Sequence, residues 1–278
     1  MRLGAPIANQ WGEDAGAWVA AVKQKGYRAA YAPIDEQASS HVRAAFRKAA
    51  QANDIIIAEV GAWSNPMATD PTTRQQAIAL CQARLALAHE IGARCCVNIA
   101  GSRGREWDGP DAANYAEDTF ALIVDTVREI IDAVRPTQSV YTLETMPWMY
   151  PDSPEVYVRL IQAIDRPQMA VHFDPINLIN SVERFYGHRA FIAHCIDLLG
   201  EHVRACHIKD MVIERPFVVA LRECAPGLGM LDYAAILTQL NRLERDTPIM
   251  LEHLTHAEQY DAAATYVRDV ATAQELIV

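Results

Sequence analysis

The stretch Met169-Ala-Val-His-Phe-Asp-Pro-Ile-Asn177 contains the pattern that decides the predicted fold. Its first five residues form a short, mostly apolar run, which is typical of a buried strand in a parallel sheet. Asp174 follows at once, so the strand ends on a carboxylate. Three further runs have the same form: Val140-Tyr-Thr-Leu-Glu144, Val203-Arg-Ala-Cys-His207 and Pro248-Ile-Met-Leu-Glu252. Each passes directly from a short strand-like run to one side chain that can bind a metal ion.

The spacing of these four strand ends predicts a barrel. The separations are 30, 33 and 45 residues (144 to 174, 174 to 207 and 207 to 252). An eight-unit β/α barrel of about 250 residues gives roughly 31 residues to each unit. The four runs therefore fit successive strands, and the carboxyl ends of all parallel strands lie on one rim of such a barrel.

Strand-like and helix-like segments alternate along the whole chain. The expected strands are residues 3–8, 28–33, 54–60, 95–100, 139–144, 169–174, 202–208 and 248–252. The expected helices are residues 13–25, 41–53, 72–91, 111–134, 155–164, 183–199, 231–243 and 256–276, with a long connection over 209–230. This order predicts an α/β fold, a TIM (β/α)8 barrel with eight parallel strands, in a single domain spanning residues 1–278. An open doubly wound sheet is the alternative, but it normally has a glycine-rich turn after its first strand, and residues 3–11 contain only Gly4.

The composition restricts the classes of partner. A net charge of -10 repels the phosphate backbone of DNA and RNA, so nucleic acid is not an expected partner. No run approaches the roughly 20 apolar residues of a membrane span, and residues 1–6 lack the order of a signal peptide, so we expect a cytoplasmic protein with no membrane partner. The 6 cysteines show no paired CxxC spacing and are interpreted as small core residues.

The four strand ends together predict a metal site. They supply three carboxylates and one imidazole, from Glu144, Asp174, His207 and Glu252. A divalent cation would relieve the repulsion between carboxylates that meet on one rim. This donor set suits Mn²⁺, Mg²⁺ or Co²⁺ better than a structural zinc ion, which favours cysteine and histidine. Taken singly, each carboxylate could instead cap a helix or accept loop hydrogen bonds, and the histidine could be an ordinary core residue; their joint spacing favours the metal site.

Several motifs resemble the xylose isomerase-like TIM-barrel superfamily, which contains sugar phosphate isomerases and epimerases, inosose dehydratases and AP endonuclease 2-type domains. The motifs are Glu59-Val-Gly-Ala-Trp63, Leu143-Glu144, His172-Phe-Asp-Pro-Ile-Asn177, His207-Ile-Lys-Asp210, Pro226-Gly-Leu-Gly-Met-Leu-Asp232 and Leu251-Glu-His253. The resemblance implies that the four strand-end residues bind one divalent metal ion, with Mn²⁺ expected and Mg²⁺, Co²⁺ or Zn²⁺ as alternatives. It also implies that Glu144 and Glu252 act as the catalytic acid/base pair.

Two residues on the ligand-bearing strands are candidates for contact with the metal site or the substrate. His172 shares a strand face with Asp174, and Lys209 shares one with His207, because strand side chains alternate with a period of two. We expect His172 either to hydrogen-bond a metal ligand and substrate or to be a packed interior histidine. Lys209 would bind a substrate oxygen, or would pair with Asp174 or Asp210.

The loops after the strands supply further candidates for substrate binding. Glu59, at the end of the third expected strand, could reach a substrate hydroxyl. Trp63, Trp107 and Trp148 follow the third, fourth and fifth strands, where they would form an aromatic wall against a sugar ring or cover the barrel core. Asn177 stands where epimerases of the superfamily that the chain resembles often have a substrate-binding histidine. This departure puts an ordinary ketohexose substrate in doubt.

The predicted function is that of a divalent-metal-dependent sugar isomerase or epimerase. A metal ion that binds a sugar's carbonyl and neighbouring hydroxyl acidifies the C–H between them and stabilises the resulting enediolate. One glutamate would remove the proton and the other would return one. The expected partner is a small sugar or cyclitol substrate, and the resemblance leaves a homo-oligomer open. A lyase or dehydratase that acts on an inosose or a 3-keto sugar through the same site is the alternative.

Two further classes of protein fit the sequence less well. The endonucleases of the superfamily use a three-metal cluster with additional histidines, whereas this chain has Glu59 and Asn177 at two of the corresponding positions. Its acidic charge also disfavours DNA. A non-catalytic binding module would have no need of an intact set of four metal ligands.

Overall fold

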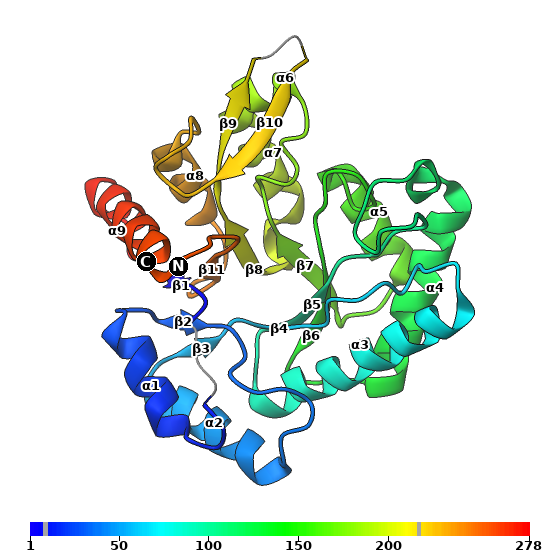
Figure 1. Cartoon of the computed structure of the whole chain (residues 1–278), viewed down its shortest axis with the longest axis horizontal. Helices are drawn as coiled ribbons and strands as arrows, with labels where there is room; N and C mark the ends of the chain where they lie inside the picture. The colour runs from blue at the N-terminus through cyan, green and yellow to red at the C-terminus, as the bar shows by residue number, and fades with distance from the viewer. Residues whose placement is uncertain (8–10, 216–217) are drawn as a thin grey trace.

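The computed structural model describes residues 1–7, 11–215 and 218–278. Its main sheet has nine strands in the order β3-β2-β1-β11-β8-β7-β6-β5-β4, and all neighbouring pairs are parallel (Figure 1). The strands are β1 (Arg2–Gly4), β2 (Ala29–Ala30), β3 (Ile56–Ile57), β4 (Glu59–Gly61), β5 (Cys95–Asn98), β6 (Val140–Glu144), β7 (Met169–Phe173), β8 (Val203–Ile208) and β11 (Pro248–Leu251). Only Ala58 separates β3 from β4, so these two edge segments make one barrel strand and the sheet closes through the chain itself. The predicted TIM barrel is confirmed.

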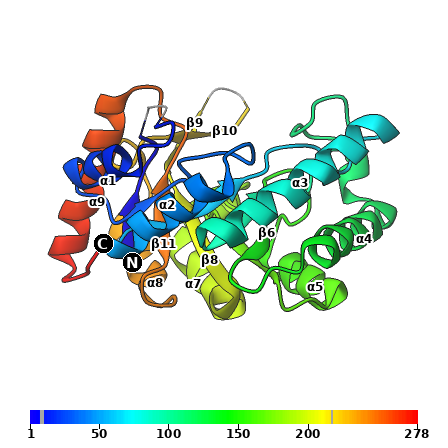
Figure 2. The ribbon, with the colours of Figure 1, turned by 90° about the horizontal axis from the view of Figure 1, so that it is seen from below.

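The helices lie around the outside of the strands, as Figures 1 and 2 show. They are α1 (Ala15–Gln24), α2 (Ser40–Ala52), α3 (Pro71–Ile91), α4 (Glu117–Val134), α5 (Pro154–Ile164), α6 (Val182–Tyr186), α7 (His188–Leu199), α8 (Tyr233–Leu240) and α9 (Ala257–Ala273), with short 3-10 turns η1 (Ala112–Tyr115) and η2 (Gly200–His202). The two chain ends meet, because the amine of Met1 donates to the carbonyl of Ile277 at 3.2 Å. Among the described residues, no helix has both the length and the apolar character needed to cross a membrane.

Some boundaries differ from the sequence prediction. The expected first strand, residues 3–8, is shorter in the structure, and residue 8 lies outside the described residues. The expected helix over 111–134 divides into η1 and α4, because Ala116 is extended (φ -74, ψ 148) and not helical. The expected helix over 183–199 likewise divides at Gly187. The predicted end of the helix before Gly92 is confirmed, since Gly92 adopts the left-handed conformation (φ 73) that glycine favours.

A hairpin occupies part of the connection for which only a long loop was expected. β9 (Asp210–Glu214) pairs antiparallel with β10 (Ala220–Cys224) in a separate two-stranded sheet. β9 begins two residues after β8 ends, so the hairpin extends from the carboxyl end of a barrel strand and projects away from the barrel (Figure 1). It thus stands on the rim where the expected metal ligands lie.

The core packs tightly behind this rim. Tyr157 of α5 is fully buried, and its hydroxyl accepts a hydrogen bond from the Leu143 amide (3.2 Å) and donates to the Ala170 carbonyl (3.0 Å). The side chain therefore ties the end of β6, next to Glu144, to the first residues of β7. Five of the six cysteines are buried and Cys224 is half-buried, which agrees with their interpretation as small packing residues.

Candidate metal centre and substrate cavity

The four expected ligands meet at the carboxyl ends of four barrel strands. Glu144 is the last residue of β6, Asp174 follows β7, His207 lies near the end of β8 and Glu252 follows β11. All four side chains are buried, and one donor atom from each lies within 4.8 Å of a donor atom from every other. The parallel order β11-β8-β7-β6 produces this convergence, because each strand presents its ligand to the same rim.

His207 lies at the centre of the group. Its Nδ1 is 2.8 Å from Glu144 Oε1 and also 2.8 Å from Glu252 Oε2, while its Nε2 is 3.3 Å from Glu59 Oε1. Burial opposes protonation of His207, but Glu252 and the neighbouring groups raise its pKa well above its usual value, so both ring nitrogens carry a proton at neutral pH. A cation bound at Nδ1 would replace the proton there, and the proton on Nε2 would be donated to Glu59. Nδ1 would then present its lone pair toward the two carboxylates. A cation between these three groups satisfies all of them, and a carboxylate on the second ring nitrogen is the usual arrangement for a histidine that binds a metal.

Glu59 lies behind His207 and holds two histidines. It is 1% exposed, and its second oxygen, Oε2, is 2.6 Å from His172 Nε2. The rings of His172 and His207 pack edge to face with centroids 4.2 Å apart. Burial alone would raise the pKa of Glu59, but His207 and His172 lower that pKa to about 2. Glu59 is therefore a carboxylate at neutral pH, and its charge is directed at the histidines.

Lys209 connects two of the carboxylates. Its Nζ is 2.6 Å from Glu252 Oε1 and 2.9 Å from Asp174 Oδ2. Pairing with Asp174 was one of the two expected roles of this lysine. Burial raises the pKa of Asp174 to about 6 although Lys209 opposes the increase, because Glu252 and Glu144 add to it. Burial would also raise the pKa of Glu252, but His207 and Lys209 hold that pKa well below its usual value.

The donor set fits a hard divalent cation. Asp174 Oδ1 accepts hydrogen bonds from the amides of Ile176 (2.8 Å) and Asn177 (3.0 Å), which fixes the carboxylate. Asp174 Oδ2 is buried and has no hydrogen-bond partner among the described residues, although Lys209 Nζ forms an ion pair with it at 2.9 Å. Three carboxylates and one imidazole are ligands that Mn²⁺ and Mg²⁺ accept. Glu144, Asp174, His207 and Glu252 would hold the ion.

A cavity of about 470 Å³ opens above this centre. Glu144, Glu252 and Lys209 are among the residues that line it, and Asn177 contributes to one side. The indoles of Trp63, Trp107 and Trp148 also line it and are 43%, 42% and 38% exposed. Large aromatic side chains exposed around a buried polar floor are typical of a site for a small molecule with an apolar face. Glu59 and His172, which were expected to contact substrate, are not among the described residues that line this cavity.

The comparison with protein families agrees with this geometry. A family model described as xylose isomerase-like TIM barrel matches residues 19–272. The chain belongs to this family. The resemblance that the sequence motifs indicated is confirmed, and a search of curated proteins found no match.

Solved structures related to this xylose isomerase-like barrel share its fold at low sequence identity. A 3-keto-D-glucoside 4-epimerase from E. coli is 16% identical, with a TM-score of 0.69 over 97% of this chain and 99% of that chain. A probable 3-DHS dehydratase from Bacillus anthracis is 13% identical, with a TM-score of 0.70 over 97% and 98% of the two chains. A xylose isomerase-like TIM barrel protein from Mycobacterium smegmatis in complex with magnesium is 15% identical, with a TM-score of 0.67 over 98% and 97%.

Sequence reasoning missed two residues of the xylose isomerase-like site. Glu223 of β10 and His253 both line the cavity, and His253 Nδ1 is 3.1 Å from Glu223 Oε1. Glu223 Oε2 is also 3.2 Å from Lys209 Nζ. His253 follows Glu252 directly in the motif Leu251-Glu-His253, so its place beside a predicted ligand could have indicated that it lies at the site. Glu223 could not be found from the sequence, because β10, the strand that carries it, was not predicted.

Proposed function

We propose that this protein is a divalent-metal-dependent sugar isomerase or epimerase. The observation that supports the proposal most strongly is the convergence of Glu144, Asp174, His207 and Glu252 within 4.8 Å at the floor of a cavity lined by tryptophans. A divalent ion held by these residues supplies Lewis-acid stabilisation of the negative charge that develops when a proton leaves a carbon beside a carbonyl. The expected ion is Mn²⁺, with Mg²⁺ as the first alternative.

Glu144 and Glu252 are the proposed acid and base. Each has an oxygen 2.8 Å from His207 Nδ1, and both line the cavity, so a substrate above the centre can meet either carboxylate. The pKa of Glu252 lies well below its usual value because His207 and Lys209 overcome the effect of burial. Glu252 is therefore ionised at neutral pH, in the form that accepts a proton. Return of a proton to the opposite face of the same carbon gives an epimer, and return to the adjacent carbon gives an aldose/ketose isomer.

The remaining residues position these groups and the substrate. Glu59 would orient His207 by accepting its Nε2–H, which leaves Nδ1 directed at the carboxylates. His172 holds the other oxygen of Glu59 at 2.6 Å and acts through it. Lys209, which lines the cavity, would bind a substrate oxygen.

The open part of the cavity suits a small polyol with one apolar face. Trp63 and Trp148 offer flat apolar surfaces on which the C–H face of a sugar or cyclitol can stack. Asn177 donates through Nδ2 to the Thr145 carbonyl at 3.1 Å, which fixes its side chain at the cavity edge. The net charge of -10 disfavours a nucleic-acid substrate.

A lyase or dehydratase that acts on an inosose or a 3-keto sugar is the second candidate. Lys209 favours it, because a buried ammonium group 2.6 Å from Glu252 can stabilise an oxygen that departs from the neighbouring carbon. The same four ligands would serve this reaction.

Product analysis distinguishes the two candidates. The Mn²⁺-loaded protein would be incubated with ketoses, aldoses, inososes and 3-keto sugars, and the products identified by chromatography and NMR. We expect an isomeric product from at least one sugar, and loss of that product after chelation. Release of water or of an aglycone would assign the lyase reaction instead, and no conversion of any compound would contradict the proposal.

A further inference from the structure

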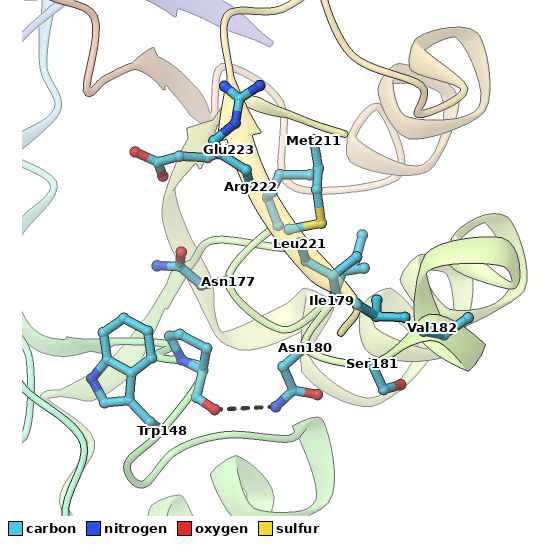
Figure 3. A pocket seen from close by; sticks show the side chains of 13 residues that line it. Trp148, Asn177, Ile179, Asn180, Ser181, Val182, Met211, Leu221, Arg222 and Glu223 are labelled. Atoms are coloured by element: carbon cyan, nitrogen blue, oxygen red, sulfur yellow. Dashed lines mark hydrogen bonds between the residues drawn. The ribbon is translucent and has the colours of Figure 1, made fainter. Parts of the chain in front are cut away.

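A second cavity adjoins the one above the metal centre. Figure 3 shows the side chains that line it. Its volume is about 710 Å³, and it shares Pro147, Trp148, Asn177 and Glu223 with the first cavity. Trp148 therefore stands at the boundary of the two spaces, and its Nε1–H donates to the Asp108 carbonyl at 2.6 Å, which fixes the indole. A molecule bound over the carboxylates can continue into the second cavity past this side chain.

The walls of the second cavity are mainly apolar. One wall is the β9–β10 hairpin, and the opposite wall is the segment from β7 to α6 (Figure 3). The aliphatic and thioether side chains in these walls are Ile176, Ile179, Val182, Met211, Val219 and Leu221. Apolar walls with a few polar groups at the edge are typical of a site for an apolar part of a small molecule.

The polar side chains of the second cavity already have partners in the protein. Arg222 Nε pairs with Glu214 Oε1 at 2.7 Å across the hairpin. Glu223 is engaged by His253 and Lys209, and Asn180 donates to the Pro147 carbonyl at 3.2 Å, the bond drawn in Figure 3. An uncharged apolar group would leave these contacts in place and displace only water.

We propose that the second cavity binds an apolar substituent attached to the sugar, so that the preferred substrate is a glycoside or similar sugar derivative that carries such a group. This inference rests on the proposed function, because the sugar must lie over the carboxylates for its substituent to pass Trp148. The size agrees with the assignment, since cavities of about 300–1,000 Å³ accommodate whole drug-sized ligands. A volume of 710 Å³ therefore accepts a phenyl group or a larger one. Leu221 and Val182 face this group from the two walls.

Calorimetry with two matched glycosides tests the inference. The Mn²⁺-loaded protein would be titrated with methyl 3-keto-β-D-glucoside and with phenyl 3-keto-β-D-glucoside, which differ only in the apolar substituent. We expect the phenyl compound to bind at least about tenfold more tightly, because burial of a phenyl ring in an apolar cavity favours binding. Leu221→Gln is expected to remove most of this preference while leaving the affinity for the methyl compound unchanged.

Val218→Gln is the matched control. Val218 lies next to the same hairpin and is 76% exposed, and it is not among the described residues that line either cavity. This variant should keep the full preference for the phenyl compound. Equal affinity of the wild type for the two glycosides, or a preference that survives Leu221→Gln, would overturn the inference.

Failure of the inference can be distinguished from failure of the proposed function. Binding of the methyl compound without a preference for phenyl would leave the sugar site intact and refute the apolar subsite. If neither glycoside binds while a free sugar is converted, the subsite is likewise refuted and the isomerase proposal stands. If neither glycoside binds and no sugar is converted, both proposals are wrong.

Discussion

Replacement of Glu59 by glutamine tests how the metal centre is built. The buried carboxylate is 3.3 Å from His207 Nε2 and 2.6 Å from His172 Nε2, and it lines neither cavity. Glutamine keeps the shape of the side chain but removes its negative charge. That charge holds the proton on His207 Nε2 and so strengthens Nδ1 as a metal ligand. Loss of such a partner usually weakens metal binding by about 10–100-fold, which corresponds to about 1.4–2.7 kcal/mol.

The assay is a titration of the metal-free protein with Mn²⁺, in which the electron paramagnetic resonance signal measures the concentration of the free ion. Glu275→Gln is the control, because Glu275 is an exposed residue after the end of α9, close to Ile277, which contacts Met1 at the amino end of β1, so the change removes the same charge on the face opposite the rim. We expect the control to bind Mn²⁺ as the wild type does. An unchanged Mn²⁺ affinity in Glu59→Gln, with the fold intact by circular dichroism, would refute the orienting role of Glu59.

Three further predictions concern other parts of the account. Glu144→Gln should lower turnover by about 10²–10⁴-fold while part of the metal affinity remains, measured by product formation and metal analysis; near-normal turnover would remove Glu144 from catalysis. Asp174 and His207 must each lose a proton to bind a cation, and both pKa values are raised, that of Asp174 to about 6 and that of His207 well above its usual value, so Mn²⁺ affinity should fall steadily as the pH is lowered through this range. Calorimetric titrations between pH 5 and 7 check this, and a flat profile would contradict it. Tyr157→Phe should lower the free energy of unfolding in urea by about 1–3 kcal/mol, because the Leu143 amide loses its buried partner; no loss would show that water replaces the hydroxyl.

The strands and the convergence of the four candidate ligands could be predicted because one physical cause produces both. A strand in a closed parallel barrel is buried on both faces, so Met169–Phe173 and Pro248–Leu251 read as short apolar runs. A polar residue directly after such a run lies on the rim, which located Asp174 and Glu252. The period of two along a strand also indicated that His172 faces the interior.

The hairpin and the depth of the interior residues could not be predicted in the same way. β10 has the sequence Ala-Leu-Arg-Glu-Cys, is half exposed and contains no β-branched residue, so it carries no strand signal. Because β10 was not recognised, β9 could not be identified as one strand of a hairpin. Glu223 and the second cavity, which depend on this hairpin, were therefore not predicted. The position of Glu59 at the end of the third expected strand placed it near the site but could not show that its carboxylate contacts His207 and His172 and does not line the cavity. The break at Ala116 was also hidden, because alanine favours helix and tertiary packing overrides that preference.

Transfer of solvent deuterium is the most direct test of the central claim, that Glu144 and Glu252 move a proton beside a carbonyl with a divalent ion in place. Wild type, Glu252→Gln and chelated wild type would be incubated in D₂O with each sugar that the protein binds, and deuterium at each carbon followed by NMR. The account predicts uptake at a carbon beside the carbonyl in the Mn²⁺-loaded wild type, and a loss of about 10²-fold or more in the variant and in the chelated protein. Uptake that is equal in all three samples, or conversion of a sugar without any uptake of deuterium, would contradict it.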